Sequence, residues 1–84
     1  FDWYLKAARQ GVADAYFALG QLYSRGEAVA MDPVQAYAWF DLAVKGGHAV
    51  AGDWLRKEAS RLKPDEFPKA ESIVADWLSK FKKP

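Results

Sequence analysis

Cysteine, threonine and asparagine are absent from this 84-residue chain, and only seven of its residues are β-branched. Without cysteine, the chain has neither a disulfide framework nor a cysteine-ligated zinc site. Without asparagine, it has no acceptor for N-glycosylation. Because β-branched residues are the favoured material of strands, their scarcity argues against a sheet-rich fold. These absences leave a helical fold as the expectation.

Long apolar stretches are also missing. The longest unbroken runs are five residues, at 15–19 and 36–40, whereas a membrane-spanning helix needs about 20; we therefore expect no membrane span. Twelve basic and 11 acidic residues nearly balance, so no global basic field favours a nucleic-acid partner. The clearest local bias is the basic end at Lys80, Lys82 and Lys83. Single-strand binders interleave such lysines with aromatic residues, but lysines at a helix end also suit the helix dipole, which is the better explanation.

Alanine and aromatic residues are abundant, with 15 and 13 copies. Alanine is the best helix former, and glycine and proline divide the chain into helical stretches. Asp32-Pro33 predicts a helix start, and Gly46-Gly47 predicts a helix stop. Pro68 leaves two interpretations open: a separate turn at 64–67, or a last helix that begins near Pro68. The predicted helices cover residues 1–10, 13–25, 33–45, from 48 or 49 to about 62, and a last stretch ending near 81.

The sequence repeats itself with a period of 36 residues. Trp3-Tyr4, Ala7-Ala8 and Gly11 recur as Trp39-Phe40, Ala43-Val44 and Gly47, and the match continues from Ala15 to Ala51 and from Leu19 to Leu55. A helical hairpin repeated at such a period indicates an α-solenoid. Small residues at Ala15 and Gly20 would let helices approach closely, and Tyr23, Trp39 and Phe40 would fill the space between hairpins. We expect all four tryptophans to be core residues rather than a ligand cage.

The spacing of these residues resembles a known family. Ala7-Ala8-x-x-Gly11, Leu19-Gly20-x-x-Tyr23-x-x-Gly26 and Asp32-x-x-x-Ala36-x-x-Trp39-Phe40-x-x-Ala43-x-x-x-Gly47 are similar to the Sel-one-like repeat (SLR) family, a relative of the tetratricopeptide repeat (TPR). The resemblance implies an all-α, right-handed α-α superhelix of about five helices. Ala28 departs from it, because family members usually have glycine there, and this predicts an altered turn.

The resemblance also predicts how the chain is organised. Residues 1–26 would hold a partial repeat and the first helix of the next one, 32–62 a second hairpin, and 64–82 a closing helix similar to that of bacterial members. We therefore expect the C-terminal end of a longer array. The resemblance implies a periplasmic or cell-envelope setting as one option and leaves the cytoplasm as another.

Catalytic motifs are not recognisable. His48, the single histidine, follows Gly46-Gly47, where a loop or capping role is expected. The serines lie in no nucleophile-elbow motif, and Gly46-Gly47 lacks the GK[ST] of a phosphate loop. We predict no catalytic residue, no cofactor and no metal site.

Solenoids bind extended partners along a concave surface, and in TPR-like hairpins the first helix of each repeat lines it. By resemblance those helices are 13–25 and 49–62. Phe17 is the most informative of the residues that would face the groove, as an exposed aromatic anchor; the alternative is that it packs on the neighbouring repeat. For the polar residues of the set, a plain solvated face is the favoured alternative. The predicted partner-binding residues are Asp14, Phe17, Gln21, Ser24, Asp53, Lys57 and Ser60, with Val50 beside them.

The expected function is a non-catalytic protein–protein interaction module, a scaffold or adaptor that binds a protein or peptide. Two alternatives stay open. One is a self-associating module, a homodimer formed through the truncated N-terminal edge of Phe1, Trp3 and Tyr4, because about three repeats are usually needed for stability. The other is an envelope-linked hydrolase, a role suggested for relatives with paired cysteines, which this chain lacks.

Overall fold

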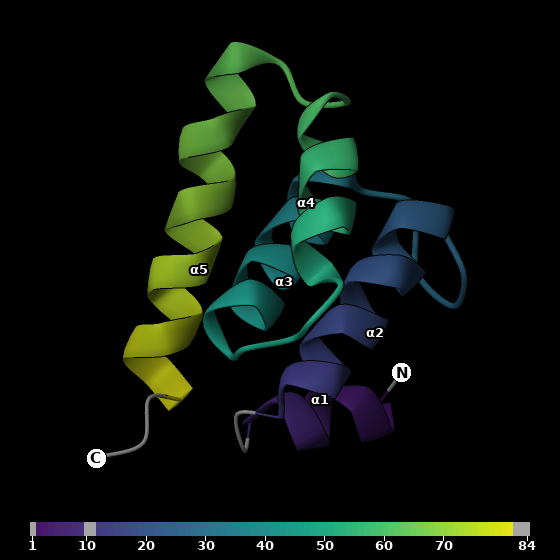
Figure 1. The fold of residues 1–84 in the computed structure, drawn as a ribbon, viewed down its shortest axis with the longest axis vertical. Coiled ribbons are helices and arrows are strands. Elements are labelled where there is room, and N and C mark those ends of the chain that lie inside the picture. Colours follow the sequence, from purple (N-terminus) through teal and green to yellow (C-terminus); the bar gives the residue numbers. More distant parts are fainter. Residues whose placement is uncertain (1, 10–11, 82–84) are drawn as a thin grey trace.

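The computed structural model describes the backbone of residues 2–9 and 12–81 and the side chains of residues 5–8 and 12–80 (Figure 1). This part of the chain is helical and contains no strand, which confirms the predicted all-α fold and its five helices. The helices are α1 (Asp2–Arg9), α2 (Ala13–Arg25), α3 (Pro33–Lys45), α4 (Ala51–Ala59) and α5 (Phe67–Phe81), with a short 3-10 helix η1 (Pro64–Glu66) before α5.

Helix α3 is the central element. It packs against α2, α4 and α5, while α1 packs against α2. Figure 1 shows α5 running along one side of α3 and α2 lying on the other side, with α1 beneath the start of α2. The arrangement buries α3 most completely, because its apolar residues must serve three neighbours.

The ends of α3 lie where the sequence predicts them. Asp32 Oδ1 accepts hydrogen bonds from the backbone N–H groups of Val34 and Gln35, at 3.0 and 3.2 Å, which is the geometry of an N-cap. Pro33 follows at the first helical position, where no N–H is needed. The N–H of Gly46 closes the other end on the carbonyl of Leu42.

Helix α4 is shorter than predicted: it begins at Ala51 and ends at Ala59. Before its start, the backbone N–H of Val50 donates a hydrogen bond to His48 Nδ1 at 3.3 Å. This bond holds residues 48–50 in a turn, so the helix begins after them. At its end, the N–H of Leu62 donates to the carbonyl of Ala59 at 3.2 Å, a tighter turn than an α-helix makes. The predicted start at 48 or 49 and the predicted end near 62 are therefore wrong.

The segment before α5 settles which interpretation of Pro68 holds. Pro64–Glu66 forms a separate 3-10 turn, and α5 begins at Phe67. Glu66 Oε1 accepts a hydrogen bond from the backbone N–H of Lys63 at 2.8 Å, which fixes the turn. Pro68 then lies in the first turn of α5, where its missing N–H costs nothing.

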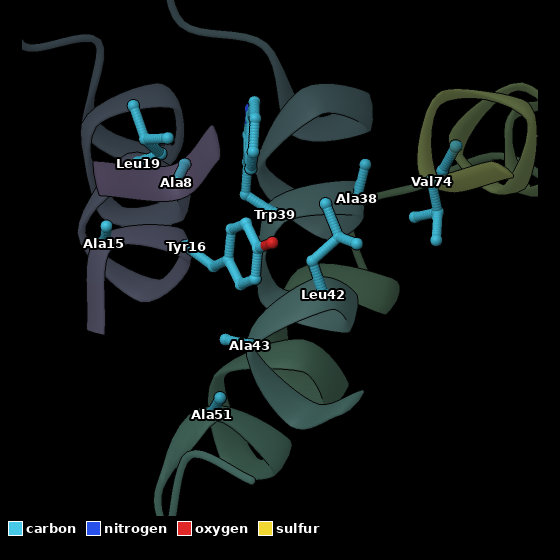
Figure 2. Close-up of a cluster of buried hydrophobic side chains, with 11 residues drawn as sticks. Ala8, Ala15, Tyr16, Leu19, Ala38, Trp39, Leu42, Ala43, Ala51 and Val74 are labelled. Carbon is cyan, nitrogen blue, oxygen red and sulfur yellow. The ribbon is translucent and has the colours of Figure 1, made fainter. Parts of the chain in front are cut away.

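Neighbouring residues Trp39 and Phe40 direct their rings into two different clusters. Trp39 stacks with Tyr16 of α2 at 6.1 Å and meets Trp77 of α5 edge-on at 4.7 Å. Figure 2 shows Tyr16 and Trp39 side by side between α2 and α3, with Leu42 directed from α3 toward Val74 of α5.

Phe40 fills the second cluster. Fully buried, it lies against Gly20 of α2 and contacts the rings of Phe17 and Trp54, at centroid distances of 5.7 and 5.9 Å. One aromatic pair thus joins α3 to α2 and α5 on one side, and to α2 and α4 on the other. This is the role predicted for Trp39, Phe40 and Gly20.

Candidate functional site

Helices α2 and α4 lie side by side with their corresponding ends together. At the N-terminal ends, His48 Nε2 lies 3.4 Å from Asp14 Oδ1. Near the C-terminal ends, Ser24 Oγ donates a hydrogen bond to Glu58 Oε1 at 2.9 Å. We call the surface that the two helices share the α2–α4 face. It comprises five of the predicted partner-binding residues (Asp14, Phe17, Gln21, Ser24 and Lys57) together with Arg25, His48, Trp54 and Arg61, whereas Asp53 and Ser60 bond within the α4 segment.

Trp54 lies at the middle of this face. Its ring is half-buried and meets the ring of Phe17 edge-on, at a centroid distance of 5.4 Å. Two cations lie over it, Arg25 at 6.0 Å and Lys57 at 5.8 Å from the ring centroid. Cations at this distance are attracted by the electron-rich face of the indole. The structure therefore joins α2 and α4 through a cation-flanked tryptophan that the sequence indicated only as a core residue.

The expected exposure of Phe17 is wrong. Its side chain is half-buried, stacks on the His48 ring at 4.3 Å, and also contacts Phe40 and Trp54. The alternative, that Phe17 packs on the neighbouring repeat, describes its geometry. Phe17 packs against Trp54 and supports the α2–α4 face, and Trp54 is the aromatic residue with cations over its ring.

The other predicted residues divide into two groups. Asp14 and Ser24 reach across to the α4 side, through His48 and Glu58, and Gln21 is half-buried on α2. The other three predicted residues are solvent-exposed on α4 or at its C-terminal end, and their contacts are to residues of the same segment. Asp53 pairs with Arg56, Ser60 Oγ donates to the carbonyl of Lys57 at 2.7 Å, and Lys57 lies over Trp54.

A buried carboxylate ties the C-terminal ends of α2 and α4 together, and the sequence did not predict it. Glu58 is only 4% exposed; it accepts a hydrogen bond from Ser24 and one from Arg61 Nη1 at 2.9 Å. Arg61 Nη1 also donates to Ser24 Oγ at 3.2 Å. The 36-residue offset gave no signal for Glu58, because it relates Glu58 to the apolar Leu22.

Two surface hollows lie elsewhere on the described part of the chain. One, of about 450 Å³, is lined by α3 residues Tyr37, Asp41 and Lys45 and by α5 residues such as Glu71 and Leu78. Burial and the nearby carboxylates of Asp41 and Glu71 raise the pKa of Tyr37, against a smaller opposing effect of Lys45. A second hollow, of about 600 Å³, lies between the start of α3 and the segment from Glu66 to Ile73. None of the seven predicted residues lines either hollow.

The remaining expectations concern membrane spans, metal ligands, the N-terminal edge and the basic C-terminal end. Among residues 2–9 and 12–81, no helix is long and apolar enough to cross a membrane, and no three His, Cys, Asp or Glu side chains are grouped as metal ligands need to be. The N-terminal edge predicted for self-association (Phe1 and the side chains of Trp3 and Tyr4) lies outside the described residues, as do Lys82 and Lys83. Lys80 forms an ion pair with Asp76 at 3.3 Å.

A model of the Sel1 repeat matches residues 1–12 and 13–48, which together make up more than half of the chain. This chain belongs to the Sel1 repeat family. The second match contains α2 and α3 and equals in length the 36-residue period found in the sequence. The Sel-one-like resemblance is therefore confirmed. Sel1 repeats are TPR-like helical units that typically serve as protein–protein interaction modules.

Curated relatives carry the same kind of sequence inside longer proteins. The alginate biosynthesis protein AlgK of Azotobacter vinelandii is 37% identical over 73 residues, 87% of this chain and 16% of that protein. AlgK of Pseudomonas syringae pv. tomato is 32% identical over 74 residues, 88% of this chain and 16% of that protein. Chitin synthase regulatory factor 3 of Schizosaccharomyces pombe is 39% identical over 57 residues, 68% of this chain and 6% of that protein. This chain thus spans about a sixth or less of the length of these relatives.

Proposed function

We propose that this Sel1 repeat chain is a scaffold module that binds a protein or peptide partner on the α2–α4 face and carries out no catalytic step itself. The observation that carries the proposal is the half-buried Trp54 ring with Arg25 and Lys57 over it. Binding energy in protein interfaces concentrates on tryptophan, tyrosine and arginine, with polar groups around them. Trp54 and Arg25 supply both residue types from two different helices.

The rigidity of the face supports the same proposal. Phe17 and Phe40 hold Trp54 from beneath, and the bond from Ser24 to Glu58 fixes the far end of α4 against α2. A partner therefore meets a surface that needs little ordering on binding, and preorganisation reduces the entropic cost of association. Such a surface suits a scaffold better than a mobile loop would.

The names of the relatives suggest which partners to test first. Two are alginate biosynthesis proteins and the third is a regulatory factor of chitin synthase. We therefore propose that the partner belongs to a polysaccharide-synthesis assembly. This part of the proposal depends on the relatives alone, whereas the choice of face depends on the geometry.

A charge-reversal pair tests the choice of face. Lys57→Glu reverses the charge over the Trp54 ring. The control, Lys69→Glu, makes the same charge reversal at an exposed position of α5 that lines the second hollow. Both variants, made in the full-length protein, should keep the helical circular dichroism of the parent. We expect partner recovery in quantitative pull-downs to fall about tenfold for Lys57→Glu and to stay unchanged for Lys69→Glu. Equal recovery for both, or a loss confined to Lys69→Glu, would refute the α2–α4 face.

A further inference from the structure

Three cationic side chains meet where α2 and α4 end. Arg25 and Lys57 lie over the Trp54 ring. Arg61 Nη1 lies 3.2 Å from Ser24 Oγ and 3.3 Å from the Ser24 carbonyl oxygen on α2. Arg25 and Arg61 are separated by 36 residues, the period of the repeat; Arg25 is the last residue of α2, and Arg61 follows the end of α4 at Ala59. The cluster is a feature of the stacked repeats, because neither helix alone would assemble it.

Few carboxylates balance this cluster. Glu27 lies 3.7 Å from Arg25, and more than half of each side chain is exposed, so the pair contributes little and can be replaced by a partner's carboxylate. Glu58 is buried and already engaged by Ser24 and Arg61. Lys57 forms no ion pair with any residue in the described part of the chain. The cationic end of the face therefore has unused capacity for anions.

The opposite end of the face has the reverse character. The side chain of Asp14 is 91% exposed beside His48. Asp14 and Arg25 are 11 residues apart on α2, a distance of about 16 Å along the helix. About five residues of extended peptide cover that distance. A carboxylate-bearing peptide is attracted to the Arg25 end and repelled from the Asp14 end.

Helix dipoles alone do not explain the cluster. Basic residues in the last turn of a helix are favourable in themselves, and this accounts for Arg25 and Arg61 near their helix ends. It does not account for the approach of both Arg25 and Lys57 to the Trp54 ring, nor for Gln21, which precedes Lys57 by one 36-residue period. The Gln21 amide both donates and accepts hydrogen bonds, as the backbone of an extended peptide requires.

We propose that the α2–α4 face binds an extended acidic peptide segment, with its carboxylates toward Arg25, Lys57 and Arg61 and one apolar side chain against Trp54. The inference rests on the proposed function and adds the chemistry of the partner to it. Charge complementarity selects the acidic segment, because cationic groups face its carboxylates at one end and the exposed Asp14 carboxylate repels them at the other.

Fluorescence polarisation of the full chain with a defined peptide tests this proposal. The probe is a labelled octapeptide of four glutamates, one phenylalanine and three glycines, and its control has glutamine in place of each glutamate. We expect the acidic probe to bind about tenfold tighter than the control at low salt, and the difference to shrink as salt is raised. Arg25→Gln combined with Lys57→Gln should weaken binding of the acidic probe about fivefold, because two screened ion pairs are lost. Lys69→Gln should leave it unchanged.

Several results would overturn the inference: equal affinity for the two probes, no binding of the acidic probe at about millimolar protein, or a double variant that binds as the parent does. Arg61 is left intact in these variants because its loss would remove one of the hydrogen-bond donors of the buried Glu58 carboxylate. Failure here remains distinguishable from failure of the proposed function. If Lys57→Glu still abolishes capture of the natural partner, the face is correct and the acidic chemistry is wrong.

Discussion

Gly20 sets how closely α2 approaches α3. A Cβ at this position would lie 2.5 Å from Cδ1 and Cε1 of Phe40, which is fully buried and has no room to move. Elsewhere in a helix, replacing glycine with alanine stabilises by about 1 kcal/mol. Here the clash dominates, because overpacking a core costs about 1–3 kcal/mol.

We therefore expect Gly20→Ala to lower the free energy of unfolding by about 1–2 kcal/mol. Gly52→Ala on α4 is the matched control, since a Cβ there meets nothing within 4 Å, and it should raise stability by up to about 1 kcal/mol. Urea unfolding measures both. A stabilising Gly20→Ala would mean that α2 and α3 are not in the close contact described.

Ala28 has a backbone conformation that favours glycine. Its φ is +63°, in the left-handed region that alanine rarely adopts. The sequence resemblance placed glycine here in other family members and predicted an altered turn; the turn instead keeps a glycine-like conformation with alanine in it. A left-handed alanine costs about 1 kcal/mol relative to glycine.

Ala28→Gly should therefore raise the free energy of unfolding by about 0.5–1 kcal/mol, despite the extra flexibility that glycine gives the unfolded chain. Ala30→Gly lies in the same exposed connection, and the described part of the chain contains no other non-glycine residue at positive φ. That control should destabilise slightly. If both substitutions destabilise equally, the left-handed backbone at Ala28 is wrong.

At the scale of the elements, the contrast between α3 and α4 shows what a sequence can predict. Local signals bound α3, because Asp32 and Gly46 make their caps within the same segment, and such signals are readable. The start of α4 depends on His48, which is held by Asp14 and Phe17 of α2. Contacts from a distant helix leave no mark in the local pattern, so the predicted start was wrong.

The link from Ser24 through Glu58 to Arg61 should matter for stability. Arg61→Ala removes one of two partners of a buried carboxylate, and a buried charged group left short of hydrogen bonds is costly. We expect a loss of about 1–3 kcal/mol. The double variant Arg61→Ala with Glu58→Gln should lose less than the sum of the single variants. Additive losses in this double-mutant cycle would show that the two side chains do not interact.

Tyr37 of α3, near Glu71 of α5, should make the stability of the fold fall at alkaline pH. Burial and the carboxylates of Asp41 and Glu71 raise its pKa above the ordinary 10.0. The phenol of Tyr37 ionises at a lower pH in the unfolded chain than in the folded chain. Its contribution to the free energy of unfolding is therefore fully present below about pH 10 and is lost as pH rises through the folded pKa. Between about pH 9 and about pH 11, the free energy of unfolding should fall less for Tyr37→Phe than for the parent. An identical fall would remove Tyr37 as a cause.

At the scale of the whole molecule, the 36-residue period predicted the fold because a helical hairpin that recurs in sequence indicates an α-solenoid, and the related residues Ala15 and Ala51 are both buried. Trp39 and Phe40 pack into two aromatic clusters, and the missing side chain of Gly20 leaves room for the Phe40 ring, as the repeat suggested. The candidate site was only partly predictable. The period related Gln21 to Lys57, but it gave no means to see that His48 would cover Phe17 or that two cations would approach the Trp54 ring. Those features depend on how α2 and α4 are juxtaposed.

The central claim is that partners bind the α2–α4 face and not the hollow between α3 and α5. Site-specific photo-cross-linking in the full-length protein tests it most directly, with a photoreactive phenylalanine analogue replacing Gln21 or Lys57 on one surface, and Asp41 or Glu71 on the other. We expect the same protein adduct from both Gln21 and Lys57, and from neither Asp41 nor Glu71. An adduct from the α3–α5 positions, without one from the α2–α4 positions, would contradict it.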